Sequence, residues 1–183
     1  MKYVILGIKL ILFAYLGYLF YFLIDGYDPA SYPYKPPFAI FVLDIINLFI
    51  HEAGHFFFKI FGRWVSFLGG SLFQVLLPLA LVIVTWRQNV RNVSYAAFWL
   101  GESLINVSVY IQDAPFRKLR LIAKGLIHDW NWLLSGNLEL AEPLGLAVYY
   151  LGVFICFAAI VAGVIFAIIS YKTYQDKFVF TDD

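Results

Sequence analysis

Charged residues are scarce in this sequence: Asp, Glu, Lys and Arg make up 14% of 183 residues, while 62% of the chain is hydrophobic. That composition lies outside the range of soluble domains and predicts a membrane protein. The charges nearly cancel, at 13 basic against 12 acidic residues, so no overall field attracts nucleic acid. One cysteine, Cys156, excludes an internal disulfide and is interpreted as a small buried hydrophobe.

Long polar linkers and internal repeats are also absent, which predicts a single integral membrane domain over residues 1–183. The apolar runs predict an all-α polytopic helix bundle with about five transmembrane helices. The expected spans are 3–24, 38–61, 71–86, 95–112 and 144–170. No small-x-small cleavage site follows the first run, so we interpret it as a retained anchor.

The third expected span is the shortest. Residues 71–86 cover only about 24 Å as a helix, less than a hydrocarbon core of about 30 Å, and Pro78 interrupts them. We therefore expect a short or re-entrant segment. Gly69 and Gly70 before it indicate a flexible turn where an extended strand can pair.

The segment 113–143 joins the last two spans and mixes basic, apolar and tryptophan residues, as interfacial segments do. Its "HDWNWLL" stretch predicts a short helix capped by Asp129, and the whole segment has the character of a membrane-surface lid. A slight excess of Lys and Arg on the side of this loop places it, and the N-terminus, inside.

The second span contains "HEAGH", which has the HExxH pattern. Two histidines at i and i+4, His51 and His55, lie on one face of a helix and suit two ligands of one Zn²⁺ ion. Glu52 lies off that face but within reach of a water molecule at the metal, where a general base is needed. Polar side chains at this depth are costly, which favours a shared purpose over structural histidines.

A catalytic zinc site usually needs a third protein ligand. Asp44 is two turns before His51, about 10 Å along a straight helix, which excludes it. Glu102, Asp113 and His128 remain as candidates, the last from the inner loop.

The fourth span carries Glu102, Asn106, Tyr110 and Asp113 along one stripe, which predicts that this face meets protein or water. Asn106, Tyr110 and His128 are candidate donors to a developing oxyanion. Glu102 is a candidate for a hydrogen bond to one of the metal ligands.

A membrane-embedded HExxH followed by an aspartate near the end of a later helix resembles the site-2 protease family of intramembrane zinc metalloproteases, in particular its small bacterial relatives without a PDZ domain. The resemblance implies that His51, His55 and Asp113 bind zinc and that Glu52 is the base. It also implies a bacterial inner membrane location, a site open to the cytoplasm, lipid surroundings, and a transmembrane or membrane-proximal peptide substrate. Asp113 lies in "YIQDAP" rather than the family's Asn-Pro-Asp-Gly context, so His128 and Glu102 stay open.

Three other functions fit the same residues. A zinc hydrolase acting on lipid amides or esters would use an identical site. A non-catalytic scaffold or partner subunit would bind zinc through four ligands, His51, His55, Asp113 and His128, and leave no position for water. A metal or proton pathway through Asp44 and Glu102 would need the inverted repeat that transporters often show, and the chain lacks one.

Overall fold

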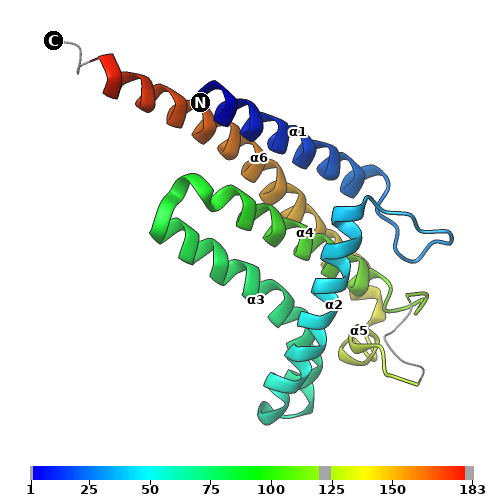
Figure 1. Ribbon diagram of the computed structural model, residues 1–183. Coiled ribbons are helices and arrows are strands. Elements are labelled where there is room, and N and C mark those ends of the chain that lie inside the picture. The colour runs from blue at the N-terminus through cyan, green and yellow to red at the C-terminus, as the bar shows by residue number, and fades with distance from the viewer. Residues whose placement is uncertain (1, 120–124, 180–183) are drawn as a thin grey trace.

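The computed structural model describes residues 2–119 and 125–179, and within these ranges the chain is helical with no strand (Figure 1). The all-α prediction is confirmed. The long helices are α1 (Lys2–Asp25), α2 (Phe38–Phe58), α3 (Arg63–Asn89), α4 (Val93–Gln112) and α6 (Ala141–Val179). The short ones are η1 (Lys59–Phe61), η2 (Val90–Asn92), α5 (Asp129–Leu133) and η3 (Leu138–Leu140).

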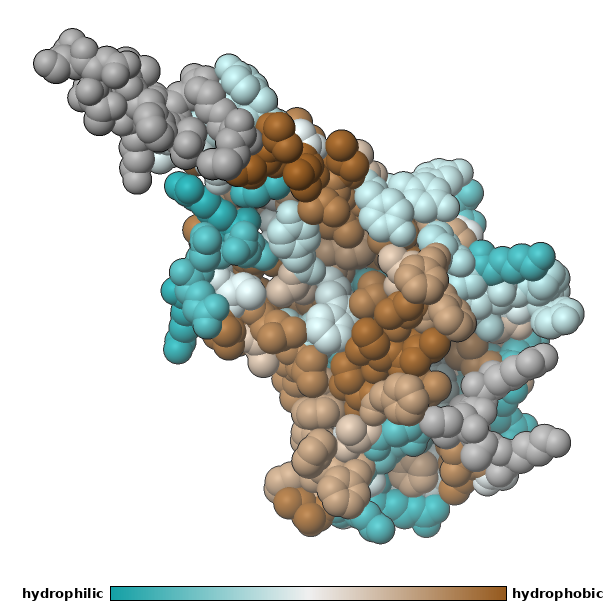
Figure 2. Space-filling view, in the orientation of Figure 1, coloured by the Kyte–Doolittle hydropathy of each residue, from teal (hydrophilic) through white to brown (hydrophobic). Residues whose placement is uncertain are grey.

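Four helical segments of the described chain are long and apolar enough to cross a membrane: Tyr3–Asp25, Phe38–Phe61, Arg63–Gln112 and Leu138–Thr173. The third contains both α3 and α4, which fold back on each other through η2 (Figure 1). In Figure 2, brown apolar side chains cover much of the visible face and teal polar ones gather near its margins. By the length and apolarity of these helices, the chain is an integral membrane protein.

α3 differs from the short span that the sequence predicted. It has 27 residues, about 40 Å at 1.5 Å each, because it begins directly after Gly62, whose φ of 95° reverses the chain. Pro78 lies inside the helix without ending it. Gly69, expected in a flexible turn, is also helical, and a Cβ on Gly54 would lie 2.3 Å from its carbonyl oxygen. The glycines here allow two helices to touch, as small residues do in membranes.

α4 and α6 form the centre of the bundle and pack closely. A Cβ added at Gly152 of α6 would lie 2.7 Å from the carbonyl oxygen of Gly101 in α4, so glycine is required for this approach. Side chains from α1, α2, α4 and α6 meet in one buried cluster: Leu19, Leu23, Ile40, Phe98, Ile105, Cys156 and Ala159. Since lipid is as apolar as these side chains, van der Waals packing holds the cluster together.

α2, which carries the HExxH pattern, is inclined steeply to the other long helices (Figure 1). The first turns of α1 and the last described turns of α6 lie at one end of the bundle, where the rings of Tyr3 and Tyr171 are 5.5 Å apart (Figure 1).

Candidate metal centre

The two histidines of HExxH lie side by side on α2. His51 and His55 are one turn apart, with ring centroids separated by 4.8 Å. His51 is buried against α3, where a Cβ on Gly70 would lie 2.6 Å from its Nε2 atom. Glycine at that position makes room for the imidazole. The expected pairing of the two histidines on one helix face is therefore present.

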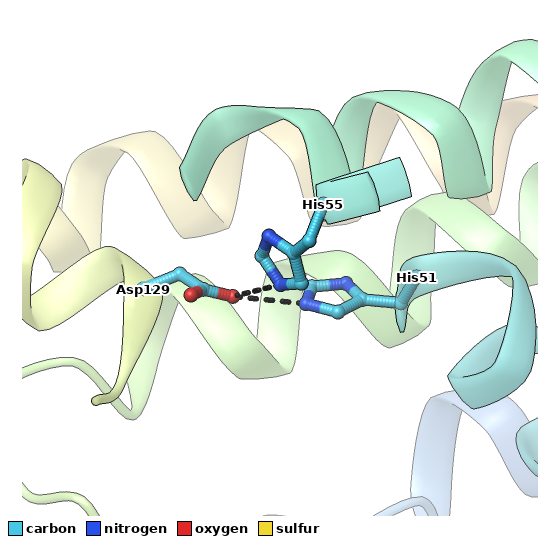
Figure 3. Close-up of side chains that lie close together, drawn as sticks. All are labelled: His51, His55 and Asp129. Carbon is cyan, nitrogen blue, oxygen red and sulfur yellow. Dashed lines mark hydrogen bonds and ion pairs between the residues drawn. The ribbon is translucent and has the colours of Figure 1, made fainter. Parts of the chain in front are cut away.

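The carboxylate that meets these histidines is Asp129. Its Oδ2 lies 2.9 Å from His51 Nε2 and 3.2 Å from His55 Nε2 (Figure 3). One ligand atom from each of the three residues lies within 4.8 Å of the others, the spacing of a group that can hold a metal ion. The side chains of α2 and α5 thus converge on one point, although the helices are distant in sequence.

α5 is fixed in place from three directions. The Trp130 indole N–H donates to Ser71 Oγ at 3.0 Å, and Asn131 Nδ2 donates to the Ala114 carbonyl at 2.8 Å. Trp132 stacks on Phe67 of α3 with ring centroids 4.4 Å apart. Asp129 is thereby held over the histidines by contacts with α3 and with the chain after α4.

A backbone contact sets the tautomer of His55. Its Nδ1 lies 2.8 Å from the Ser66 carbonyl oxygen, which can only accept a hydrogen bond, so Nδ1 carries the hydrogen. Nε2 of the neutral ring then presents a lone pair toward Asp129 Oδ2, another acceptor, 3.2 Å away. Two acceptors at that distance need a proton or a cation between them. Imidazole held by a carbonyl at its other nitrogen is the common arrangement for metal-binding histidine.

Asp129 is ionised and well supported. Burial alone would raise the pKa of its carboxyl, but when a proton lies between His55 and Asp129, hydrogen bonds from His51 and His55 outweigh burial and lower the pKa to about 2. Tyr110 of α4 donates its hydroxyl to Oδ2 at 3.2 Å and accepts from the Asp129 backbone N–H at 3.1 Å. Asp129 therefore offers the charged form that a metal requires.

Asp113 and His128, which we expected to be ligands, lie outside this group. Asp113 Oδ2 is 3.3 Å from His128 Nε2, but the angle is too poor for a hydrogen bond. Asp113 instead accepts from the backbone N–H groups of Lys118 and Leu119, each at 2.9 Å. His128, rather than Asp129, caps α5, with Nδ1 accepting from the Asn131 N–H at 3.3 Å. Asp113 is drawn away from the site because it closes the turn after α4.

Glu102 and Asn106 also contact α2, but away from the histidines. Asn47 donates to Glu102 Oε2 at 2.9 Å, and Glu102 Oε1 has no hydrogen-bond partner in the described chain. Asn106 donates to Asp44 Oδ1 at 3.1 Å and accepts from Gln74 at 2.8 Å. The polar stripe of α4 does meet protein, as expected, and Tyr110 is its member that reaches the histidines.

Two cavities open on the group. One of about 690 Å³ is lined by the three converging residues and by Lys59, Arg63 and Phe67, among others. The other, about 470 Å³, extends toward Asp44 and Asn106. His51, Glu52 and Tyr110 line both, so the cavities meet beside His51. Glu52 forms no hydrogen bond or ion pair with the described residues and faces open space beside His51.

No family model, curated protein or solved structure matches this chain. Asp129 was missed as a candidate metal ligand because its position after a histidine and before a tryptophan equally suits a helix cap. The signal that could have found it is the "HD" pair itself, a carboxylate beside the third histidine in the segment expected to cover the site. Asp129 directly follows His128, which the sequence indicates as a candidate ligand.

Proposed function

We propose that this protein is a membrane-embedded zinc metallohydrolase, and specifically an intramembrane peptidase similar to the site-2 proteases. The observation that carries the proposal is the convergence of His51 Nε2, His55 Nε2 and Asp129 Oδ2 within 4.8 Å. Two imidazoles and one carboxylate are the ligand set of many catalytic zinc hydrolases. Asp129 takes the place that the resemblance assigned to Asp113.

The donor set fits the metal. His55 presents an unprotonated Nε2 because Ser66 holds its Nδ1–H, and Asp129 is ionised. When bound, zinc supplies a Lewis acid that makes water nucleophilic at neutral pH and polarises a carbonyl. The same ligand set can hold Fe²⁺, so the identity of the ion is part of the test.

Glu52 serves as the general base. It lines both cavities at their junction and has no partner among the described residues, so its carboxylate is available. Glu52 takes a proton from the attacking water as the hydroxyl joins the carbonyl carbon. It then delivers that proton to the leaving nitrogen as the C–N bond breaks. The Tyr110 hydroxyl lies beside the group, and its hydrogen, which it donates to Asp129 Oδ2 here, would have to turn toward the carbonyl to stabilise the oxyanion.

Three candidate ligands converge among the described residues, one fewer than a closed four-ligand site needs, which favours catalysis over a zinc-stabilised scaffold. The scaffold requires His128 and Asp113 as further ligands, and these two residues face each other. Hydrolysis of a lipid amide or ester would use the same groups. We take a peptide as the substrate because of the resemblance to the site-2 proteases. The same resemblance indicates a bacterial inner membrane, and the slight excess of Lys and Arg on the side of the 113–143 segment indicates that the N-terminus is inside.

Metal analysis of the full chain, purified in detergent through a tag without histidine, tests the proposal. We expect about one zinc per chain in the wild type and near-complete loss in His51→Ala, which removes one of three ligands. A wild type without zinc would contradict the proposal, and one with iron in its place would contradict zinc hydrolysis while keeping the metal centre.

A further inference from the structure

We propose that Lys59 and Arg63 form an anion-binding subsite beside the metal group, that is, beside His51, His55 and Asp129. The subsite selects a peptide substrate with a carboxylate near the scissile bond. This inference rests on the proposed function and names a feature of the substrate. Both side chains line the 690 Å³ cavity that contains His51, Glu52, His55 and Asp129. They are its only Lys or Arg side chains among the described residues.

Lys59 belongs to the same helix face as the histidines. It follows His55 by four residues, and the backbone stays helical there, with Lys59 at φ −57° and ψ −34°. Its side chain therefore continues the row of His51 and His55 by one turn toward the cavity mouth. An anion bound there would lie about one helical turn from the metal group.

Arg63 begins α3 and is held by aromatic rings. Its guanidinium carbon lies 5.7 Å from the Phe67 ring centroid and 5.1 Å from that of Trp132, and these two rings stack on each other. Cation–π contacts restrict the side chain without neutralising its charge. Since Trp132 belongs to α5, the helix that supplies Asp129 also positions this positive charge.

Neither cation forms an ion pair within the described chain. The acids of the same cavity are Glu52, needed as the base, and Asp129, engaged by two histidines. Basic residues at the ends of membrane helices often lie at the headgroup level without further purpose. These two differ because both line the cavity of the metal group.

The second cavity fixes the direction in which a substrate lies. Besides His51, its acidic and basic lining consists of Asp44 and Glu52, with no Lys or Arg among the described residues. An anion is repelled from that side and attracted to the Lys59 side, so the carboxylate of a bound chain has one favourable place.

Peptide binding to zinc-loaded full-length protein carrying Glu52→Gln, which prevents turnover, tests the subsite. The probes are pairs of short acetylated, amidated peptides that differ only by Asp or Asn at one position. We expect the preferred Asp peptide to bind about fivefold more tightly than its Asn partner at low salt. The preference should disappear at about 1 M salt, where the Debye length is about 3 Å.

Two double variants with equal loss of charge separate the subsite from general electrostatics. Lys59→Gln with Arg63→Gln should abolish the preference for Asp. Lys35→Gln with Arg87→Gln, two exposed positions away from the cavity, should keep it. Helicity and zinc content of every sample show that the protein is folded and loaded.

Zinc content also distinguishes the two possible failures. Absence of zinc from the wild type overturns the proposed function. If the zinc-loaded protein binds the Asp and Asn peptides equally, or binds neither, the subsite alone is overturned. Vesicles of phosphatidylcholine with and without phosphatidylglycerol provide the last arm. If binding to phosphatidylglycerol vesicles depends on Lys59 and Arg63 while the protein shows no preference for the Asp peptide, the two cations bind lipid headgroups. That result would overturn the proposal.

Discussion

His51 and Asp129 are 78 positions apart in the chain, yet His51 Nε2 and Asp129 Oδ2 are separated by only 2.9 Å. The contact joins the HExxH helix to a five-residue helix in the interfacial segment, so the metal group is complete only when α5 is docked. The proposed metal binding is therefore coupled to the folding of that segment.

Asp129→Ala should remove metal, whereas Asp113→Asn should not. Loss of a supporting residue around a metal site typically costs 10- to 100-fold in affinity, and loss of a ligand costs at least as much, so we expect a decrease of about 100-fold or more for Asp129→Ala. Asp113→Asn keeps an acceptor for the Lys118 and Leu119 N–H groups. Zinc content and competition with a chromophoric chelator measure both. The reverse ranking would restore Asp113 as the ligand.

The contrast between these aspartates marks what could be predicted from the sequence. HExxH is a local pattern, so helical geometry alone placed His51 and His55 together. The third ligand depends on how a loop folds back over two helices, and no local pattern encodes that. The expected depth of Asp113 in the membrane suits a metal ligand. However, both of its carboxylate oxygens accept hydrogen bonds from backbone N–H groups of the turn that follows it.

The third span was misjudged for a related reason. Gly69 and Gly70 have low helix propensity in water, which predicts a turn. In the protein they lie within α3, because the close contact between Gly69 and Gly54 requires residues without side chains. Packing between membrane helices outweighs intrinsic propensity here, and only the tertiary structure reveals it.

Glu52→Gln should keep zinc and lose hydrolysis. The side chain lies outside the ligand group, so zinc content should stay at the wild-type level. Loss of the base should lower the rate of hydrolysis of a mixture of membrane peptides by about 100- to 10,000-fold. Glu139→Gln, an exposed glutamate after α5, is the matched control and should behave as wild type. Unchanged hydrolysis in Glu52→Gln would exclude Glu52 as the base.

Tyr110→Phe should weaken metal binding without preventing it. The change removes the hydroxyl that donates to Asp129 Oδ2 and accepts from its backbone N–H, while the ring beside His51 remains. We expect about 10- to 100-fold lower zinc affinity, as for other groups that orient a ligand. Tyr150→Phe, at an exposed position on α6, should have no effect. Equal affinities in the two variants would show that Asp129 needs no support from Tyr110.

Gly70→Ala should impair metal binding while leaving the fold intact. A Cβ at this position would lie 2.6 Å from His51 Nε2, 2.7 Å from Cε1 and 2.9 Å from Cδ2, so the imidazole must move. Alanine is a better helix former than glycine by about 1 kcal/mol, and α3 itself therefore gains rather than loses. The displaced ring no longer aims Nε2 at the point shared with His55 and Asp129, and we expect zinc affinity to fall about tenfold or more. Gly17→Ala in α1, where an added Cβ meets nothing within 4 Å, is the matched control and should keep full affinity.

Because a general packing defect would lower thermal stability along with zinc affinity, thermal stability and zinc affinity are measured on the same samples with and without chelator. Loss of stability in the chelated Gly70→Ala protein would contradict a specific effect on His51, whereas loss of affinity alone supports the close contact between α3 and the metal group.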